Sequence, residues 1–478
     1  MKKDLAYLLL VSTFLAVVVT GCRKERFLDT GGELRFSLDT LTFDTVFTSL
    51  GSFTASVKIY NPQNQPVKLS SVRLDGGDES QFNINVNGHK GNFVKDIEIA
   101  PKDSIYVFAT VNIDPRPNDI KPFVVQDRLI ATLNGKEYTL PFLAFGQNAY
   151  YLVDSLITSD QVWNTDKPYV IIHNAAIDEN VTVTIPAGCR IYVHGDSRLL
   201  VLGKLLVNGT KQDSVVFQGD RLDRKYFGNE GYPGEWGGIY FFPQSSGSII
   251  NYAVIKNVGN STRLGEGVFT PAAIQLNYDT IKPDEAQLTL RNTIIENSIG
   301  HGILSFYGSL IMENCLINTC GASCLAAVQG GFYLIDNCTF VTYGTGKVSH
   351  VDNPVMGLLN YFKVSETSYL GGALQVLMRN SVVWGSLETE FITDGAEGIP
   401  FEVTLENCLV KNKDGMPQGV TATNCKVNEE PKFKNYTNWD YHPSEGSPLI
   451  NGGKDIGLIT DLDGKARDNQ PDIGCYEY

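Results

Sequence analysis

Residues 310–319 read LIMENCLINT, and residues 333–342 read YLIDNCTFVT. Five other segments align with these two on a single asparagine, and the repeat this creates decides the fold. The seven aligned asparagines are Asn251, Asn292, Asn314, Asn337, Asn380, Asn407 and Asn424. The clearest neighbours are 22 or 23 residues apart and others about twice that. This spacing indicates a structural unit of about 22 residues with occasional insertions.

The residues around each asparagine follow one pattern. Apolar or small side chains stand two positions before it, one after it and three after it, as in Met312, Cys315 and Ile317 around Asn314. A straight strand would place inward side chains at even spacing, so the change of parity predicts a corner. Asparagine tolerates the left-handed conformation of such a corner. Its amide can also form a ladder with equivalent amides above and below.

Short strands and corners that repeat every 22 residues or so predict a parallel β-helix. Residues 181–220 support this, because they alternate through short strands broken at glycines. This stretch resembles the opening coils of right-handed parallel β-helix proteins, the pectate-lyase-like superfamily. EWGGIYF at 235–241 matches a rung that those proteins often carry. The resemblance covers 150–440 and the C-terminal segment, and it implies a fold rather than an activity.

The N-terminus has the features of an export signal. Lys2 and Lys3 precede an apolar run over 5–19 that is too short to span a bilayer. The run ends in Gly21-Cys22 and resembles a bacterial lipobox. The resemblance implies that residues 1–22 carry a signal peptide, that Cys22 is acylated, and that a membrane holds the mature chain. An outer membrane or cell surface is the expected location, with everything after Cys22 outside the bilayer.

A separate domain is predicted over 34–147, after a linker at 23–33. Residues 105–113 (IYVFATVNI) alternate as a half-buried strand does, and similar runs are separated by turn residues. About seven short strands in roughly 110 residues favour an antiparallel β-sandwich. KIYNPQNQPVKLSSVRLDGG at 58–77 resembles immunoglobulin-like domains of the major-sperm-protein and abnormal-spindle type. Such domains usually act as spacers or binding modules.

The last segment, 441–478, contains SPLING followed by DLDGKARD and DIGCYEY. It resembles the terminal segment common in exported β-helix proteins. We expect it to cap the open end of the β-helix, with Arg467 paired to a carboxylate. The run from Asp461 to Gly464 leaves a calcium site open as an alternative. No other metal and no cofactor are predicted.

Eight cysteines follow Cys22, and four of them share one inward position after the asparagine: Cys315, Cys338, Cys408 and Cys425. This favours a column of buried thiols. Export to an oxidising compartment leaves a disulfide that involves Cys320 or Cys324 as an alternative. Zinc is disfavoured, because no Cys-x-x-Cys pair or paired histidine is present.

Candidate binding residues lie in one insertion, at 220–236. It combines acids, bases and aromatic side chains that can stack on sugar rings and bond to their hydroxyls. The candidates are Asp220, Arg221, Asp223, Arg224, Tyr226, Tyr232, Glu235 and Trp236. Other long insertions lie near 260–270, 343–372 and 386–399, and loops on one side of a solenoid often form its binding groove. A loop that is merely solvated would have the same composition.

Three functions stay open at this point. The first is a non-catalytic, monomeric surface lipoprotein that binds polysaccharide or another macromolecule, and it is the one we predict. The second is a carbohydrate-active enzyme, a polysaccharide lyase or glycoside hydrolase that uses the 220–236 loop, although no catalytic residue can be assigned. The third is a structural or adhesive stalk. The net charge of −14 argues against a nucleic-acid partner.

Overall fold

The computed structural model describes residues 26–115, 122–222, 231–261, 263–264, 267–268, 270–278, 285–365 and 368–478. The chain forms two compact units, Met1–Asn148 and Ala149–Tyr478. Strands dominate both units, and the helices within the described residues are short 3-10 turns, η1 (Gly77–Glu79) and η3 (Tyr436–Asn438). No helix in the described ranges is long and apolar enough to cross a membrane.

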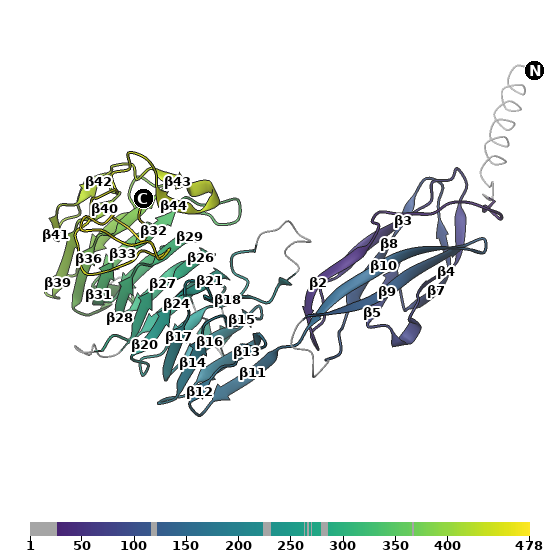
Figure 1. Cartoon of the computed structure of the whole chain (residues 1–478), viewed down its shortest axis with the longest axis horizontal. Helices are drawn as coiled ribbons and strands as arrows, with labels where there is room; N and C mark the ends of the chain where they lie inside the picture. Colours follow the sequence, from purple (N-terminus) through teal and green to yellow (C-terminus); the bar gives the residue numbers. More distant parts are fainter. Residues whose placement is uncertain are drawn as a thin grey trace, which may run out of the picture. The chain divides into compact units, whose positions relative to one another are not determined.

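The first unit is a β-sandwich of two five-stranded sheets around its own core (Figure 1). One sheet has the order β1 (Arg35–Phe36), β3 (Ala55–Tyr60), β8 (Ser104–Val111), β5 (Phe82–Val86) and β6 (His89–Lys90). The other has the order β2 (Leu41–Phe47), β10 (Lys136–Gln147), β9 (Phe123–Leu133), β4 (Val67–Leu74) and β7 (Phe93–Ile99).

Alternating burial explains why these residues form a sandwich. In β8, Ile105, Val107, Ala109 and Val111 are buried between the sheets while Tyr106 and Phe108 are exposed, as a strand with one buried face requires. The predicted all-antiparallel arrangement is wrong for one pair, because β2 runs parallel to β10. That pairing joins the first long strand to the last one, so it ties the two ends of the domain together.

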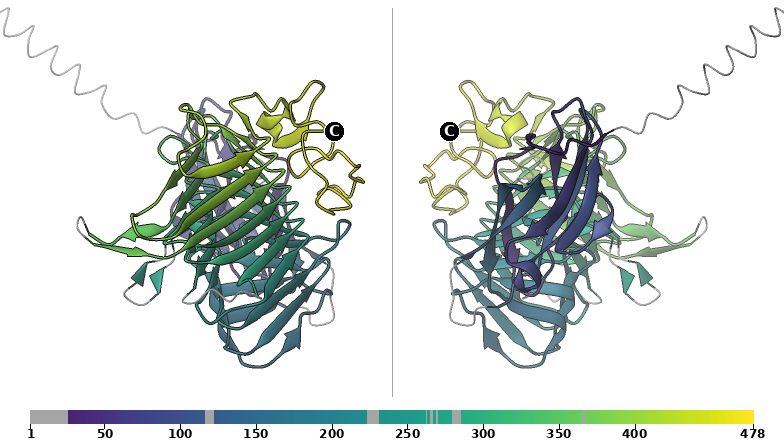
Figure 2. Two further views of the ribbon diagram at one scale, coloured as in Figure 1. Left: turned by 90° about the vertical axis from the view of Figure 1, so that its left-hand side faces the viewer. Right: turned by 90° about the vertical axis from the view of Figure 1, so that its right-hand side faces the viewer.

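The second unit is a parallel β-helix with three faces (Figures 1 and 2). Each coil passes through face A, turns into face B and then into face C. In one complete coil these strands are β25 (Leu288–Arg291), β26 (Ile294–Ser298) and β27 (His301–Phe306). Each strand pairs in parallel with its counterpart in the next coil, for example Leu290 with Met312. The predicted all-β fold class, an N-terminal β domain followed by a β-helix, is confirmed.

The remaining strands continue the three faces. Face A also contains β12 (Gln161–Val162), β14 (Thr182–Pro186), β17 (Lys204–Asn208), β20 (Ser248–Asn251), β28 (Ser309–Glu313), β31 (Gly331–Asp336), β36 (Leu374–Arg379), β39 (Phe401–Glu406) and β41 (Val420–Thr423). Face B contains β15 (Arg190–Val193), β18 (Val215–Gly219), β21 (Ala253–Val258), β29 (Leu316–Cys320), β32 (Thr339–Thr342), β37 (Val382–Gly385), β40 (Leu409–Val410) and β42 (Lys426–Val427). Face C contains β16 (Arg198–Val201), β19 (Ile239–Phe241), β24 (Ala272–Asn277), β30 (Leu325–Val328), β33 (Met356–Leu359) and β38 (Phe391–Asp394), while β11 (Tyr150–Ile157) and β13 (Tyr169–Ile177) run through both B and C.

The corner between faces A and B lies at the repeated asparagine. Six of the seven, from Asn292 onwards, have a positive φ between 47° and 53°. Their amides also bond along the column: the Nδ2 of Asn292 donates to Oδ1 of Asn251 (3.0 Å), and that of Asn380 to Oδ1 of Asn337 (3.1 Å). The sequence alignment placed the corner of the first segment, at Asn251, one residue too early. Tyr252, with φ 48°, holds the corner there, and Asn251 pairs with Arg291 instead.

The inward positions of the repeat form the core. Around Asn314, for instance, Met312, Cys315 and Ile317 have no exposed surface. All eight cysteines in the described residues are free thiols, seven of them buried. Cys315 and Cys338 stack directly, because the backbone N–H of Cys315 lies 3.4 Å from the Cys338 sulfur. The predicted thiol column therefore holds, and Cys425 is half-buried because it sits in the last coil.

The C-terminal segment lies along face B rather than across the open end, which corrects the predicted cap. Its apolar side chains, including Leu449, Ile473 and Tyr476, pack on the outer surface of β29, β32, β37 and β40. Its backbone also accepts hydrogen bonds from the corner asparagines: Asn380 donates to Lys454 O (2.7 Å) and Asn407 to Gly452 O (3.0 Å). The yellow chain beside the green strands in Figure 2 is this segment.

Arg467 holds the segment in place. Its side chain is 2% exposed, and its guanidinium pairs with the carboxylate of Glu477. It also donates to Asn314 Oδ1 (2.9 Å) and Gly474 O (3.0 Å). The predicted pairing of Arg467 with a carboxylate is therefore present, but it fastens the segment to the side of the coils.

Candidate functional site

The predicted candidates at 220–236 lie only partly within the described residues. Asp223, Arg224 and Tyr226 fall outside them. Trp236 has no exposed surface, and its indole N–H donates to Lys256 O (3.0 Å). A ring enclosed in the core offers no face to a ligand, so the prediction that Trp236 contacts a glycan is wrong. The sequence did not show whether the side chain of Trp236 points into the core of the β-helix or out of it, and the structure places it in the core.

Asp220 and His194 form an ion pair at the start of this loop. The Nδ1 of His194 lies 2.6 Å from Oδ2 of Asp220, whose side chain is 8% exposed. The hydrogen bond to Asp220 raises the pKa of His194 above its ordinary value, against the opposing effect of burial. The carboxylate of Asp220 is therefore already paired with His194.

The other described candidates lie near the surface. Arg221 and Tyr232 are exposed, and Glu235 is half-buried. The ammonium of Lys347 lies 4.3 Å from the centroid of the Tyr232 ring, and Glu235 Oε1 accepts the backbone N–H of Tyr232 (2.9 Å). A lysine over one ring face leaves Tyr232 less available for stacking on a sugar.

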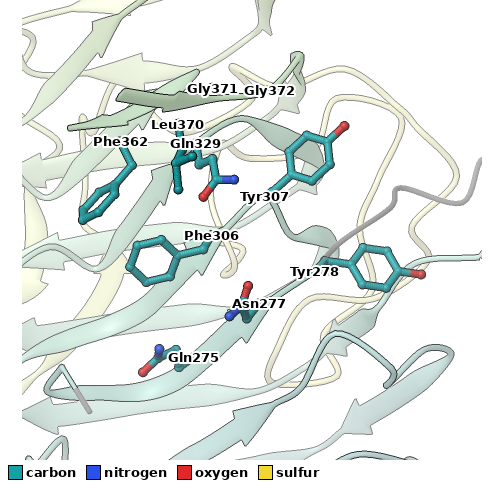
Figure 3. A pocket seen from close by; sticks show the side chains of 10 residues that line it. All are labelled: Gln275, Asn277, Tyr278, Phe306, Tyr307, Gln329, Phe362, Leu370, Gly371 and Gly372. Atoms are coloured by element: carbon teal, nitrogen blue, oxygen red, sulfur yellow. The ribbon is translucent and has the colours of Figure 1, made fainter. Parts of the chain in front are cut away.

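A groove of about 620 Å³ lies elsewhere, on the outer surface of face C (Figure 3). Its lining residues come from β24, β27, the corner after β30, and the insertion over 360–372. They are Gln275, Asn277, Tyr278, Phe306, Tyr307, Gln329, Phe362, Leu370, Gly371 and Gly372. In Figure 3, Phe306 and Phe362 stand on one side and Tyr278 and Tyr307 on the other, with Gln329 and Asn277 between them and Gln275 below Phe306.

Strand periodicity places the floor of this groove. In β24, Ile274 and Leu276 point into the core, so Gln275 and Asn277 point outwards. Register then sets Gln275 beside Leu304 of β27, and Asn277 beside Phe306. Successive coils therefore present amide and apolar side chains next to each other on one flat surface.

A hairpin forms one wall. β34 (Tyr361–Lys363) and β35 (Tyr369–Gly371) pair antiparallel within the insertion between β33 and β36. The ring of Phe362 meets that of Phe306 edge to face, with centroids 5.4 Å apart. Gly372 lets the chain return close to Tyr307, since a Cβ there would lie 2.4 Å from that ring. An alanine at position 372 would force the hairpin and the Tyr307 ring apart.

The polar atoms of the described lining residues are neutral. The ten lining residues include amides and phenols but no acid, amine, guanidinium or imidazole. Nδ2 of Asn277 donates to the hydroxyl of Tyr240 (3.2 Å). Gln275 is 8% exposed, and its Oε1 has no hydrogen-bond partner among the described residues. A buried acceptor without a donor is costly to the folded state.

A smaller hollow of about 360 Å³ lies at the other end of β24 and β27. His301 is its titratable lining residue. Burial lowers the pKa of His301 to about 4, and the Ser323 backbone N–H lies 3.3 Å from its Nδ1. At neutral pH the ring is therefore uncharged and accepts that N–H. It supplies no cation to either hollow.

The described residues contain no group of three or more His, Cys, Asp or Glu side chains placed to hold a metal ion. At the segment that left calcium open, Asp461 accepts the backbone N–H of Lys465 (2.7 Å) and of Glu477 (2.9 Å). Asp463 pairs with Lys211 and with His442 (3.1 Å). Asp461 thus holds its own turn through Lys465, and Asp463 joins the turn to Lys211 and His442.

Sequence reasoning missed the groove itself, although two signals for it were present. Residues 343–372 stood out as a long insertion, and the hairpin wall comes from it. The outward positions of β24 and β27 carry Gln275, Asn277 and Phe306, which are polar or aromatic where a solvated face would carry charges. What was missing was the register that brings the insertion over these strands.

Comparison with known proteins supports the fold. A family model described as a right-handed β-helix region matches residues 161–340. The chain matches no curated protein. One similar solved structure is a family 123 glycoside hydrolase from Clostridium perfringens, with 13% identity over 24% of this chain and 26% of that one, at a TM-score of 0.18. Another is the ASH or PapD-like domain of human CEP192, with 11% identity over 27% of this chain and 96% of that one, at a TM-score of 0.17.

Proposed function

We propose that this protein is an exported, membrane-anchored lipoprotein whose β-helix binds polysaccharide in the groove on face C, without catalysing its cleavage. The observation that carries the proposal is the groove lining, in which aromatic rings stand beside neutral amides. Sugar rings present C–H faces that pack on aromatic side chains and hydroxyls that bond to amides. The lining has both kinds of group within one hollow.

The same lining favours binding over chemistry. A lyase needs a base and a cation to neutralise the uronate carboxylate, and a hydrolase needs two carboxyl groups across the bond. None of these groups is among the ten residues that line the groove. The 220–236 loop is the place where an enzymatic alternative would lie, and Asp220 there is engaged by His194. A purely structural stalk would not require a groove with this lining.

The lipid anchor is the second part of the proposal. It rests on Gly21-Cys22 after a short apolar run, which lies outside the described residues. Acyl chains on Cys22 would hold the protein on a membrane surface as a monomer, with the β-helix free to bind surface polysaccharide.

A glycan array tests the groove. We expect the purified full-length chain to retain polysaccharide without releasing unsaturated or reducing products. Phe362 is 41% exposed, so Phe362→Ala should spare the fold but lower affinity about tenfold, the loss expected for one stacked ring. Tyr369→Ala is the matched control, because Tyr369 is 50% exposed on the same hairpin but does not line the groove.

Three results would overturn the proposal. Failure to retain any polysaccharide would remove glycan binding altogether. Equal affinity of Phe362→Ala and the unaltered chain would move the site away from the groove. Release of cleaved product would replace binding by catalysis.

A further inference from the structure

The last two coils of the β-helix place two cysteines opposite each other. β39 pairs with β41, and β40 with β42, at the end of the β-helix (Figure 1). Both registers set Cys408 beside Cys425, and both thiols are free. Adjacent parallel strands lie about 4.8 Å apart, which is within the range of Cα separations that a disulfide spans.

The two sulfurs differ in access. Cys408 has no exposed surface. Cys425 is half-buried, because β41 and β42 are the last strands of their sheets and no further coil in the described residues covers them. Ala422, at an inward position of the same coil, is exposed for the same reason. A reagent from solution therefore meets Cys425 first.

Their surroundings also give the two thiols different acidities. The thiol of Cys408 donates to the Cys425 sulfur, and this hydrogen bond lowers the pKa of Cys425 to about 7. Burial raises the pKa of Cys408 well above its ordinary value. A thiolate, and not a thiol, is the attacking group in disulfide exchange. Cys425 is thus the nucleophile of the pair.

We propose that Cys408 and Cys425 are a reversible thiol–disulfide pair, a modification site entered through Cys425 and independent of the groove. The Cys425 thiolate attacks one sulfur of a small disulfide such as oxidised glutathione, whose S–S bond breaks to release one thiolate. The Cys408 thiol then attacks the Cys425 sulfur, and the second small thiol leaves with the Cys408 proton. Two electrons pass from the protein to the small disulfide.

The geometry makes the new bond easy to reduce. Side chains at matched positions of adjacent coils leave the backbone in parallel, whereas a relaxed disulfide brings its Cβ atoms about 3.8 Å apart. Closing the bond therefore pulls the last coil towards its neighbour by about 1 Å. The last coil can move because it packs on one coil only. The strain that remains favours reduction.

Cys315 and Cys338 are an internal control in the same column. They lie opposite each other in the same register, but neither has any exposed surface and coils pack on both sides of them. They should stay reduced under conditions that oxidise the last pair.

The test incubates the folded full-length chain with excess oxidised glutathione at pH 8 and maps its cysteines by mass spectrometry without reduction. We expect two peptides joined through Cys408 and Cys425, while Cys315 and Cys338 are alkylated only after unfolding. Excess reduced glutathione should restore both thiols of the last pair. A thiol reagent should modify Cys425 at least about tenfold faster than Cys408.

Serine variants separate the two steps, and serine suits this column because Ser381 already occupies the matching buried position beside Cys408. Cys408→Ser should stop the reaction at a glutathione adduct on Cys425. Cys425→Ser should leave Cys408 unmodified. Cys338→Ser is the matched control and should still form the bond.

Other outcomes overturn the proposal. A Cys425 that stays free in oxidised glutathione would remove the modification site. A lasting adduct on Cys425 in the unaltered chain, or a bond between the Cys425 residues of two chains, would show that Cys408 does not complete the reaction. Equally fast oxidation of Cys315 and Cys338 would show that access does not select the pair. A bond that survives excess reduced glutathione would remove its reversibility.

Discussion

At the scale of single residues, asparagine does two jobs in this fold. It adopts the left-handed conformation at the A–B corner. Its side-chain amide also donates hydrogen bonds to the neighbouring corner asparagine or to backbone carbonyls of the C-terminal segment. Asn380 shows both roles: its φ is 47°, it donates to Asn337 Oδ1 (3.1 Å) and Lys454 O (2.7 Å), and it accepts the Lys454 N–H (2.9 Å). Few other side chains could make these bonds from a left-handed corner.

We therefore expect Asn380→Ala to lower the free energy of unfolding by about 2–4 kcal/mol, because the buried amide of Asn337 and the part-buried backbone groups of Lys454 lose their partner and alanine is strained at positive φ. Asn380→Gly should recover the strain but not the bonds. The exposed Asn424 of the last coil is the control, and Asn424→Ala should cost about 1 kcal/mol. Urea unfolding measures all three. Equal losses at the two positions would contradict a role for the amide.

At the scale of elements, the C-terminal segment is a strap along face B. It buries Leu316, Val341 and Trp384, which would otherwise expose an apolar face. Arg467 connects it to the coils through Asn314, and it neutralises Glu477. Burial raises the pKa of Glu477, while Arg467 opposes that rise.

Arg467→Met should weaken the attachment of the strap to face B. A buried carboxylate left without its cation costs about 3 kcal/mol or more, and protease should then cut within 447–478 first. The loss of Arg467 raises the pKa of Glu477 further. A group with a raised folded-state pKa stabilises the fold below its unfolded pKa and loses that effect as the pH rises through the folded value, so the defect should be smaller at pH 5 than at pH 8.

Two variants sharpen this experiment. Arg467→Met combined with Glu477→Gln should recover part of the lost stability, because no unpaired charge remains. Arg291→Met is the matched control: the Arg291–Glu313 pair is 2.7 Å long, but Arg291 is 42% exposed, so its loss should cost under about 1 kcal/mol. A defect of the same size in Arg291→Met, or one independent of pH, would show that the pair does not hold the strap.

At the scale of the whole molecule, two units with separate cores follow one another along the chain. The sandwich lies between the proposed export signal and the β-helix in sequence, which is the position of a spacer. This order suits a protein that is held at a surface by its first mature residue and reaches its ligand with its second unit.

The anchor is tested on the intact chain. Cells fed a fatty acid with a clickable tag should label the unaltered protein, and Cys22→Ala should lose both the label and its place in the membrane fraction. Cys425→Ala, in the last coil, should keep both. An unlabelled native chain, or a Cys22→Ala variant that remains labelled in membranes, would remove the lipoprotein part of the proposal.

The sequence by itself determined the coil, its corner and its inward-facing positions. The alternation of inward and outward side chains and the tolerance of asparagine for positive φ are both local properties of the chain. It missed the corner at Tyr252, where an adjacent asparagine offered a false register. Tertiary structure decided the groove, the burial of Trp236 and the course of residues 441–478 along face B. Each of these depends on which distant segments meet, and a hairpin that folds over Phe306 leaves no trace in the spacing of its own residues.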